Sequence, residues 1–193
     1  MMFFKRRAHL FRWLFVIDVV PSLSEIVFVL KQLPLGSLVV LRCYEHLQRK
    51  NLAHWLSRMC RKLRLIFLVA GDPFIALVTR ASGLHVREST FSKMRKWRYF
   101  KKRWFISCAS HSVKQNLKIQ AAGFDAALFS PVFRSKKTNF KAMGATKFLK
   151  YQAFTRKIGV FALGGTTRAN IWKLREARQK VGIAGINLYN DRL

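Results

Sequence analysis

Eight short apolar runs recur along the chain, and longer segments with helical signals separate them. Runs of this kind, apolar at nearly every position, are typical of parallel strands that are buried on both faces. Strands that alternate with helices predict a parallel sheet covered by helices. The runs are Phe11–Asp18, Ser37–Arg42, Leu65–Ala70, Gly83–Val86, Trp104–Ala109, Asp125–Ser130, Val160–Leu163 and Gly182–Asn187.

The segments between the runs begin and end with recognisable signals. Pro73 suits the first turn of a helix, Ser110 and Ser112 are candidate caps, and Gly123 suits a helix end. Eight strand-helix units that close on themselves predict an α/β fold, a TIM (β/α)8 barrel, as a single domain over residues 1–193, which is short for this fold. The predicted helices are Ser24–Lys31, Glu45–Leu63, Pro73–Arg80, Ser89–Lys101, His111–Ala122, Ala145–Thr155 and Arg168–Lys180.

A barrel directs attention to the residues at the carboxyl ends of its strands, because active sites of this fold lie at that rim. A charged residue at the end of an apolar strand, such as Arg42, also needs an anionic partner, since a buried unpaired charge is costly. A substrate phosphate or Asp72 would serve as this partner. The residues predicted to meet at the rim are Asp18, Arg42, Asp72, His85, Ser107, Ser130, Gly164, Gly165 and Asn187.

The seventh run continues into two glycines and two threonines, in the sequence VFALGGTT from Val160 to Thr167. Glycine lets backbone amides approach a ligand, and the first amides of a following helix carry partial positive charge. Gly164 and Gly165 are therefore candidate phosphate-binding residues. The alternative is an ordinary strand-to-helix turn that Thr166 or Thr167 caps. In a barrel, phosphate sites commonly lie after the seventh and eighth strands, which favours the first interpretation.

The chain is strongly basic, with 37 Lys and Arg against 8 Asp and Glu and a formal net charge of +29. Such a charge predicts anionic partners. The densest cluster, Lys93–Arg103, interleaves cations with aromatic residues, as a nucleic-acid groove does. A basic helix whose rings face the core explains the same pattern, and the cations are spread over the whole chain. Nucleic acid is therefore a candidate partner through charge only.

Cys43, Cys60 and Cys108 form neither a disulfide framework nor a zinc motif, so we expect buried free thiols and a cytoplasmic location. The amino-terminal segment has cations before an apolar stretch, but Arg12 and Asp18 interrupt it. No uncharged run reaches the ~18 residues of a membrane span, so we expect no transmembrane segment.

The order of several motifs resembles the thiamine-phosphate synthase and TenI family from about Phe11 to Tyr189. The most specific stretch has a His and hydroxyl residues at a helix start, then AAG, a strand and SPVF. The motifs are LVAGD at Leu68–Asp72, SGLHVRE at Ser82–Glu88, SHSVKQNLKIQAAGFDAALFSPVF at Ser110–Phe133 and LGGTTRAN at Leu163–Asn170.

This resemblance implies a transferase of thiamine biosynthesis that joins a pyrimidine pyrophosphate to a thiazole phosphate, with Mg²⁺ on the pyrophosphate. It implies catalytic roles for Arg42 and His85 and a metal-ligand role for Asp72. His85 at a strand end is equally compatible with a structural role. The residues implied to bind substrate or phosphate are Gly164, Gly165, Ser135, Lys136, Lys137 and Asn187.

The chain also departs from the family pattern, so it resembles a divergent member of the family. Val40 and Tyr44 stand in place of the Gln and Lys of the family's Gln-x-Arg-x-Lys strand. Gly71 and Thr90 stand where the family has an Asn and an acidic magnesium ligand, and Ala109 replaces a Ser. The phosphate loop reads Ser135, Lys136, Lys137 and Thr138, and Pro131 stands where the TenI branch has a His. The cationic loop Arg134–Lys137 can partly replace the metal, because Lys and Arg also neutralise pyrophosphate oxygens.

Three hypotheses follow. The first is a thiamine-phosphate synthase, and the second is a catalytically altered or inactive barrel that still binds phosphate esters. The third is a basic nucleic-acid-binding protein on a barrel scaffold. The expected partners are phosphorylated small molecules, and a homo-oligomer is compatible with the sequence.

Overall fold

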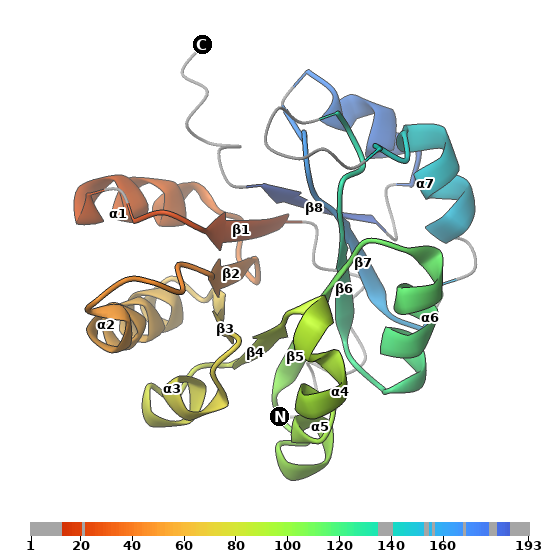
Figure 1. Cartoon of the computed structure of the whole chain (residues 1–193). Coiled ribbons are helices and arrows are strands. Elements are labelled where there is room, and N and C mark those ends of the chain that lie inside the picture. Colours follow the sequence, from red (N-terminus) through yellow and green to blue (C-terminus); the bar gives the residue numbers. More distant parts are fainter. Residues whose placement is uncertain are drawn as a thin grey trace.

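The computed structural model describes residues 13–20, 22–134, 141–152, 155, 157–167, 169–177 and 181–185. Within these ranges, eight parallel strands close into a barrel in the order in which they occur in the sequence. The ring of strands with helices around it is visible in Figure 1, where β1 and β8 lie side by side. The predicted TIM barrel is confirmed.

The strands are short and the helices vary in length. The strands are β1 (Trp13–Ile17), β2 (Leu38–Leu41), β3 (Ile66–Ala70), β4 (Gly83–Val86), β5 (Phe105–Ser110), β6 (Ala126–Phe129), β7 (Gly159–Ala162) and β8 (Val181–Gly185). The α-helices are α1 (Leu23–Gln32), α2 (Arg49–Lys62), α3 (Pro73–Val78), α4 (Phe91–Met94), α5 (Trp97–Phe100), α6 (Val113–Ala121) and α7 (Ala145–Gln152). Two 3₁₀ helices, η2 (Glu88–Thr90) and η3 (Ile171–Ala177), complete the described elements.

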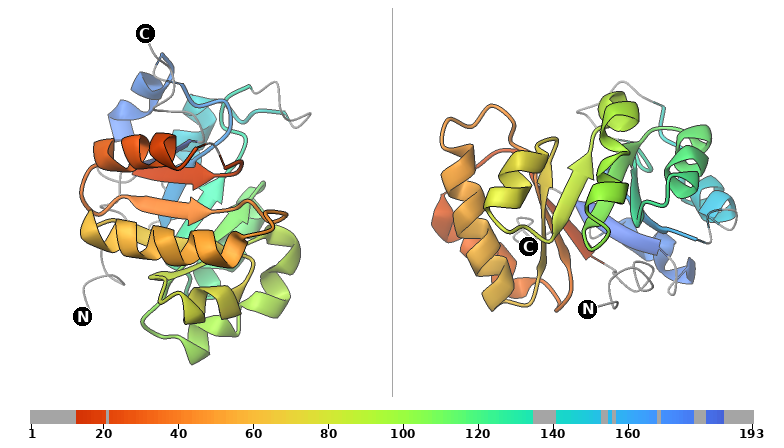
Figure 2. Two further views of the ribbon diagram at one scale, coloured as in Figure 1. Left: turned by 90° about the vertical axis from the view of Figure 1, so that its left-hand side faces the viewer. Right: turned by 90° about the horizontal axis from the view of Figure 1, so that it is seen from below.

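Alternate residues of each strand point to opposite sides, so the apolar residues divide into two clusters. One cluster fills the barrel interior, with Leu14, Leu38, Leu68 and Phe161 among its members. The other lies between the strands and the surrounding helices and includes Phe67. Figure 2 shows helices α1 and α2 along the outside of the barrel wall. Burial on both faces explains why the strands are nearly continuous apolar runs.

Side-chain caps determine where several helices begin. Ser22 caps α1 in a capping box with Glu25, so this helix begins before the predicted cap at Ser24. Asp72 caps α3, and Pro73 occupies its first turn as predicted. Ser112 caps α6 by accepting a hydrogen bond from the amide of Gln115. Each cap satisfies an amide that the helix itself leaves unpaired.

Several predicted helices differ from the structure: α2 begins at Arg49 instead of Glu45, and two others differ more. The basic segment predicted as one helix over Ser89–Lys101 is divided among η2, α4 and α5, and it turns inward where Arg98 pairs with Asp125. The helix predicted from Arg168 is the 3₁₀ helix η3, which begins at Ile171. The side chain of Asn170 bonds the carbonyl of Gly165 and the amide of Thr167, and this local turn delays the helix start.

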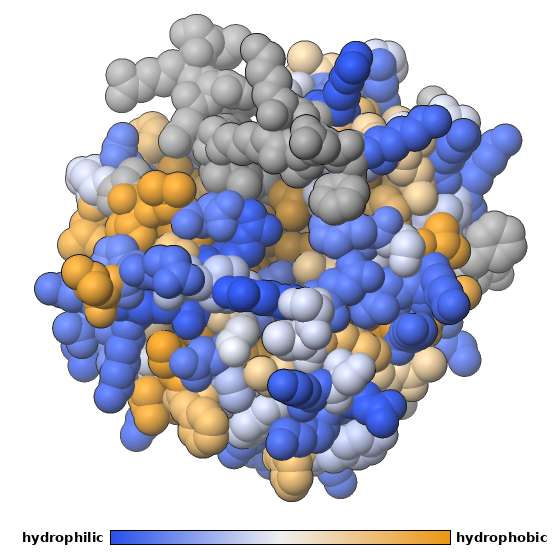
Figure 3. All heavy atoms as spheres, viewed as in Figure 1, coloured by the Kyte–Doolittle hydropathy of each residue, from blue (hydrophilic) through white to orange (hydrophobic). Residues whose placement is uncertain are grey.

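Hydrophilic side chains are spread over the coloured part of the face that Figure 3 shows, with hydrophobic groups between them. They form no single dense patch on that face. The three cysteines are buried and unpaired, as predicted. Burial raises the pKa of Cys60 and of Cys108 to about 12, which keeps both thiols protonated and poorly reactive. In the part of the chain that the structure describes, no helix is long and apolar enough to cross a membrane.

Candidate active site at the carboxyl rim of the barrel

The carboxyl ends of the strands bring the candidate site residues from most of the chain to one rim of the barrel. Each follows a different strand, and the closed order of the strands fixes its place around the ring. In ring order from β1 to β7 these residues are Asp18, Arg42, Asp72, Arg87, His111, Ser130 and Gly164.

Arg42 and Asp18 form a bidentate ion pair at the ends of β2 and β1. Arg42 donates from Nε to Asp18 Oδ1 at 2.7 Å and from Nη2 to Asp18 Oδ2 at 2.5 Å. The hydrogen bonds with Asp18 raise the pKa of Arg42 above its ordinary value, against the lowering effect of partial burial. The anionic partner of Arg42 is therefore Asp18. Asp72, the protein partner that the sequence suggested, bonds elsewhere.

His85 lies just below the rim, inside the barrel. It is 2% exposed and pairs in register with Ser107 of β5, and His85 Nδ1 and Ser107 Oγ share a hydrogen bond of 2.9 Å. Burial, together with repulsion from Arg42, lowers the pKa of His85 to about 3. The imidazole is consequently neutral at pH 7, and it serves as a hydrogen-bonding group there instead of a cation.

Tyr44, in the segment after β2, carries two arginine side chains at the same rim. The guanidinium carbon of Arg87 lies 3.2 Å from the centre of the Tyr44 ring, and that of Arg49 lies 5.3 Å from it. Arg49 also donates from Nη2 to the carbonyl of Ala70 at the end of β3. A Cβ on Gly71 would lie 3.1 Å from Tyr44 Cε1, so the glycine lets the ring approach the end of β3. We call Tyr44, Arg49 and Arg87 the arginine cluster.

The carboxylates at this rim are engaged by the protein itself. Asp18 pairs with Arg42, Asp72 Oδ1 accepts from the amide of Ile75, and Glu88 Oε2 accepts from the amide of His111. Among the described residues, no group of three or more His, Cys, Asp or Glu side chains could hold a metal ion. Mg²⁺ binds through carboxylates and substrate phosphates, and here Asp72 alone has the predicted role. Asp72 and Glu88 each use one carboxylate oxygen in these bonds, so the described rim offers a magnesium ion no more than one remaining oxygen from each.

The Gly164–Gly165 turn packs tightly against the segment that follows β6. Both glycines have positive φ, +84° and +64°. A Cβ on Gly164 would lie 2.7 Å from Ser130 Oγ, and one on Gly165 would lie 2.3 Å from the carbonyl oxygen of Arg134. The amide of Phe133 donates to the carbonyl of Gly164 at 3.0 Å. Backbone packing alone thus requires glycine at both positions.

The same turn also leaves amides available at the rim. None of the described residues accepts a hydrogen bond from the amides of Gly164, Gly165 or Thr166. The Thr166 hydroxyl donates to the carbonyl of Ala184 and thereby links the turn to β8. Unpaired amides in a turn with positive φ can receive an anion. Tight packing and phosphate binding are therefore compatible here.

Some of the predicted site residues lie close together in the structure, and others lie outside the described residues. Arg42 and His85 lie close enough for the charge of Arg42 to lower the pKa of His85, and Ser130 lies against Gly164. Ser135, Lys136, Lys137 and Asn187 lie outside the described residues.

Sequence reasoning assigned no binding role to Arg49, Arg87 or Asn170. Arg87 directly follows the GLHV strand, and this position at a strand end identifies it as a candidate rim residue. Tyr44 was recognised only as a departure from the family pattern. Its contact with both arginines joins three segments that are separated in the sequence.

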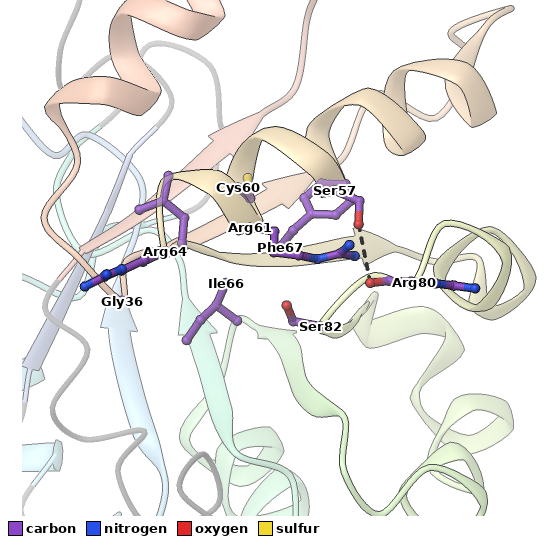
Figure 4. Close-up of a pocket in the computed structure, with 10 residues that line it drawn as sticks. Gly36, Ser57, Cys60, Arg61, Arg64, Ile66, Phe67, Arg80 and Ser82 are labelled. Carbon is purple, nitrogen blue, oxygen red and sulfur yellow. Dashed lines mark hydrogen bonds between the residues drawn. The ribbon is translucent and has the colours of Figure 1, made fainter. Parts of the chain in front are cut away.

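A hollow with a volume of about 330 Å³ lies at the opposite rim, by the amino ends of β2, β3 and β4. Its lining includes Ser57, Arg61, Arg64 and Arg80, and Ser57 Oγ donates to the carbonyl of Arg80 at 3.3 Å. Figure 4 shows the guanidinium groups of Arg64 and Arg80 pointing away from one another. Arg64 and Arg80 follow the ends of α2 and α3 with positive φ, where cations complement the helix dipole. Helix-end geometry accounts for these arginines.

Comparisons with known proteins agree with this architecture. A thiamine-phosphate synthase from Chlorobium luteolum is 30% identical over 139 residues, which cover 71% of this chain and 65% of that protein. A thiamine-phosphate synthase from Helicobacter pylori (strain Shi470) is 28% identical over 146 residues, which cover 74% of this chain and 66% of that protein. The chain thus spans slightly less than two thirds of the length of these relatives.

Solved structures share the fold at lower identity. A thiamine phosphate pyrophosphorylase from Pyrococcus furiosus has a TM-score of 0.73 and 18% identity, with 94% of this chain and 87% of that chain covered. A citrate synthase has a TM-score of 0.64 and 11% identity, with 94% and 89% covered. At these identities the likeness concerns the barrel alone.

The family model described as thiamine monophosphate synthase matches residues 19–189, nearly the whole of the barrel. The family motifs, the closed barrel and these relatives therefore agree: the chain belongs to the thiamine monophosphate synthase family.

Proposed function

We propose that the protein is a thiamine-phosphate synthase that joins a hydroxymethylpyrimidine pyrophosphate to a thiazole phosphate. One observation supports this proposal beyond family membership. The arginine cluster follows β2 and β4, and the Gly164–Gly165 turn follows β7, so the two lie across the ring of eight strands from each other. A substrate with a phosphate group at each side would place its reacting atoms over the centre of the barrel.

In this reaction, the bond between the pyrimidine methylene carbon and a pyrophosphate oxygen breaks, and its electron pair leaves with the pyrophosphate. The thiazole nitrogen then supplies its lone pair to form the new carbon–nitrogen bond. The substrates carry all reacting atoms, so the protein needs to orient them and stabilise the departing negative charge.

We assign the stabilisation of the departing charge to Arg42 and a supporting role beneath it to His85. Asp18 accepts from Nε and Nη2 of Arg42 and holds the guanidinium plane at the rim, which leaves Nη1 as the nitrogen that can bind the departing group. His85 is neutral and buried, so its role is to support the rim from below without adding a proton to the reaction. Gly164, Gly165 and Thr166 would bind the thiazole phosphate through their amides.

The test is an assay of thiamine phosphate formation by the purified chain from the two substrates, with and without Mg²⁺. We expect product, and we expect Arg42→Gln to lower the turnover by about a hundredfold, the loss typical of removing one charge-stabilising donor. Arg58→Gln, an exposed position near the end of α2, should retain the full rate.

The absence of product, with thiazole phosphate still bound, would instead identify a barrel with altered or lost catalysis. This second candidate is favoured by one specific observation. The described carboxylates at the rim are already committed to Arg42, to the start of α3 and to the amide of His111.

The basic segment Lys93–Arg103 does not add support for nucleic-acid binding. Trp97 stacks on Trp104 with ring centres 5.9 Å apart, and Arg98 is buried against Asp125. Trp97 and Arg98 are thus used in packing, whereas Tyr99 and Phe100 are 73% and 70% exposed, so the alternative interpretation, in which the rings face the core, holds only for Trp97. A cytoplasmic location stays part of the proposal and follows from the biosynthetic role and the buried thiols.

A further inference from the structure

We propose that the arginine cluster binds the diphosphate group of the substrate directly, without a divalent metal ion between them. The identity of this ligand rests on the proposed function. The cluster itself, with Tyr44 as the platform and Arg49 and Arg87 as the anion-binding groups, rests on contacts in the structure.

The first argument is geometric. Tyr44 projects from the end of β2 across β3, and its ring touches the position where a Cβ of Gly71 would stand. Arg87 reaches the same ring from the end of β4, with its guanidinium carbon 3.2 Å from the ring centre. A cation held on an aromatic ring loses little conformational freedom when it binds an anion, because the ring has already restricted it.

The second argument concerns charge. The ion pairs among the described residues are Arg42–Asp18 and Arg98–Asp125, so neither Arg49 nor Arg87 is neutralised by a described carboxylate. Nε of Arg49 is buried and has no hydrogen-bond partner within the described part of the chain. Two like charges beside one ring repel each other unless an anion lies between them.

The third argument comes from the carboxylates. A magnesium ion on a diphosphate supplies two positive charges and needs protein oxygens to hold it in place. The described carboxylates at the rim already accept hydrogen bonds from the protein. Two guanidinium groups supply two positive charges, as many as one magnesium ion. Arginine also matches phosphate oxygens with a planar pair of N–H groups. The rim therefore suits a diphosphate better than it suits the metal ion.

A simpler account is that Arg87 covers the Tyr44 ring as a surface side chain and binds nothing. The two accounts differ in what happens when the ring is altered. If the ring positions the arginine for an anion, Tyr44→Leu should weaken anion binding, and Tyr44→Phe, which keeps the ring, should preserve it. If Arg87 only covers the ring, neither change affects binding.

The experiment is titration calorimetry of the full chain with inorganic pyrophosphate, in EDTA and at physiological salt so that diffuse attraction to a chain of charge +29 is screened. We expect binding in EDTA, at least tenfold weaker affinity for Arg87→Gln and for Tyr44→Leu, and unchanged affinity for Tyr44→Phe. Arg58→Gln removes the same charge at an exposed position outside the cluster and should not weaken binding. Circular dichroism checks that each variant is folded.

Binding that requires Mg²⁺, or affinity in EDTA that Arg87→Gln leaves unchanged, would overturn the proposal. The synthase assay in the same preparations separates this failure from failure of the proposed function. Product that forms equally well with Arg87→Gln refutes the cluster and keeps the function. Pyrophosphate binding that depends on Arg87, with no product formed, supports the cluster and refutes the function.

Discussion

His85 shows how the environment of a single side chain determines its chemistry. The imidazole lies inside the barrel, bonded to Ser107 and near Arg42, so its charged form is disfavoured both by desolvation and by a like charge. Its pKa of about 3 in the folded chain is below the ordinary value of 6.5. Between these values the unfolded chain binds a proton that the folded chain does not, so stability rises with pH across this window.

We therefore expect His85 to contribute its full stability above pH 6.5 and to lose it as the pH falls toward 3. The loss should approach about 1.4 kcal/mol per pH unit, or about 2 kcal/mol between pH 7 and pH 5. Urea unfolding at these two pH values measures it. His85→Asn, which removes the titrating group, should reduce the pH-dependent difference by that amount. An equal difference in both proteins would contradict the assignment.

At the scale of elements, Arg98 and Asp125 connect α5 to the strands beneath it. Arg98 Nη1 donates to the carbonyl of Trp104 at 3.1 Å, and its Nη2 pairs with Asp125 Oδ2. Asp125 Oδ2 also accepts from the amide of Ile106 in β5 at 2.8 Å. Both charged side chains are nearly excluded from water. This pairing draws the basic segment inward and explains why the segment is not one exposed helix.

Removing one partner of this pair should be costly, because the other charge stays buried. We expect Asp125→Ala to lower the free energy of unfolding by about 3–5 kcal/mol, measured by urea denaturation. Arg98→Met combined with Asp125→Leu should recover part of this loss, since no charge is then stranded and apolar groups fill the space. A double variant that is less stable than Asp125→Ala would show that the pair has another role.

At the scale of the whole molecule, a net charge of +29 on 193 residues implies strong self-repulsion. Lys and Arg occur throughout the sequence, so the repulsion acts across the fold instead of at one site. The large apolar core in and around the barrel offsets this cost.

Screening should consequently stabilise the chain. We expect the urea midpoint at pH 7 to rise when NaCl is raised from about 20 mM to about 500 mM, with a gain of roughly 1–2 kcal/mol in unfolding free energy. A variant with the exposed Lys62, Lys93 and Lys102 changed to Glu should gain less from the same salt, because its net charge is smaller. An equal gain in both proteins would point to a salt effect unrelated to charge.

The sequence by itself determined the barrel and many of its boundaries. Strands buried on both faces must be apolar at almost every position, so all eight were visible as runs. Local signals also located two helix starts, because a cap acts within three residues, as Asp72 does on the amide of Ile75 and Ser112 on that of Gln115. The Gly164–Gly165 turn was likewise visible as a local pattern.

Only the tertiary structure decided which charged groups meet. Arg42 pairs with Asp18, which is 24 residues away in the sequence, and Arg98 pairs with Asp125, which is 27 residues away. No local pattern encodes these pairs. Tyr44 and Arg87 meet for the same reason, since closing the barrel brings the ends of β2, β3 and β4 side by side. Which charged groups meet at the rim depends on tertiary structure because the strand order of a closed ring makes neighbours of residues that are far apart in the sequence.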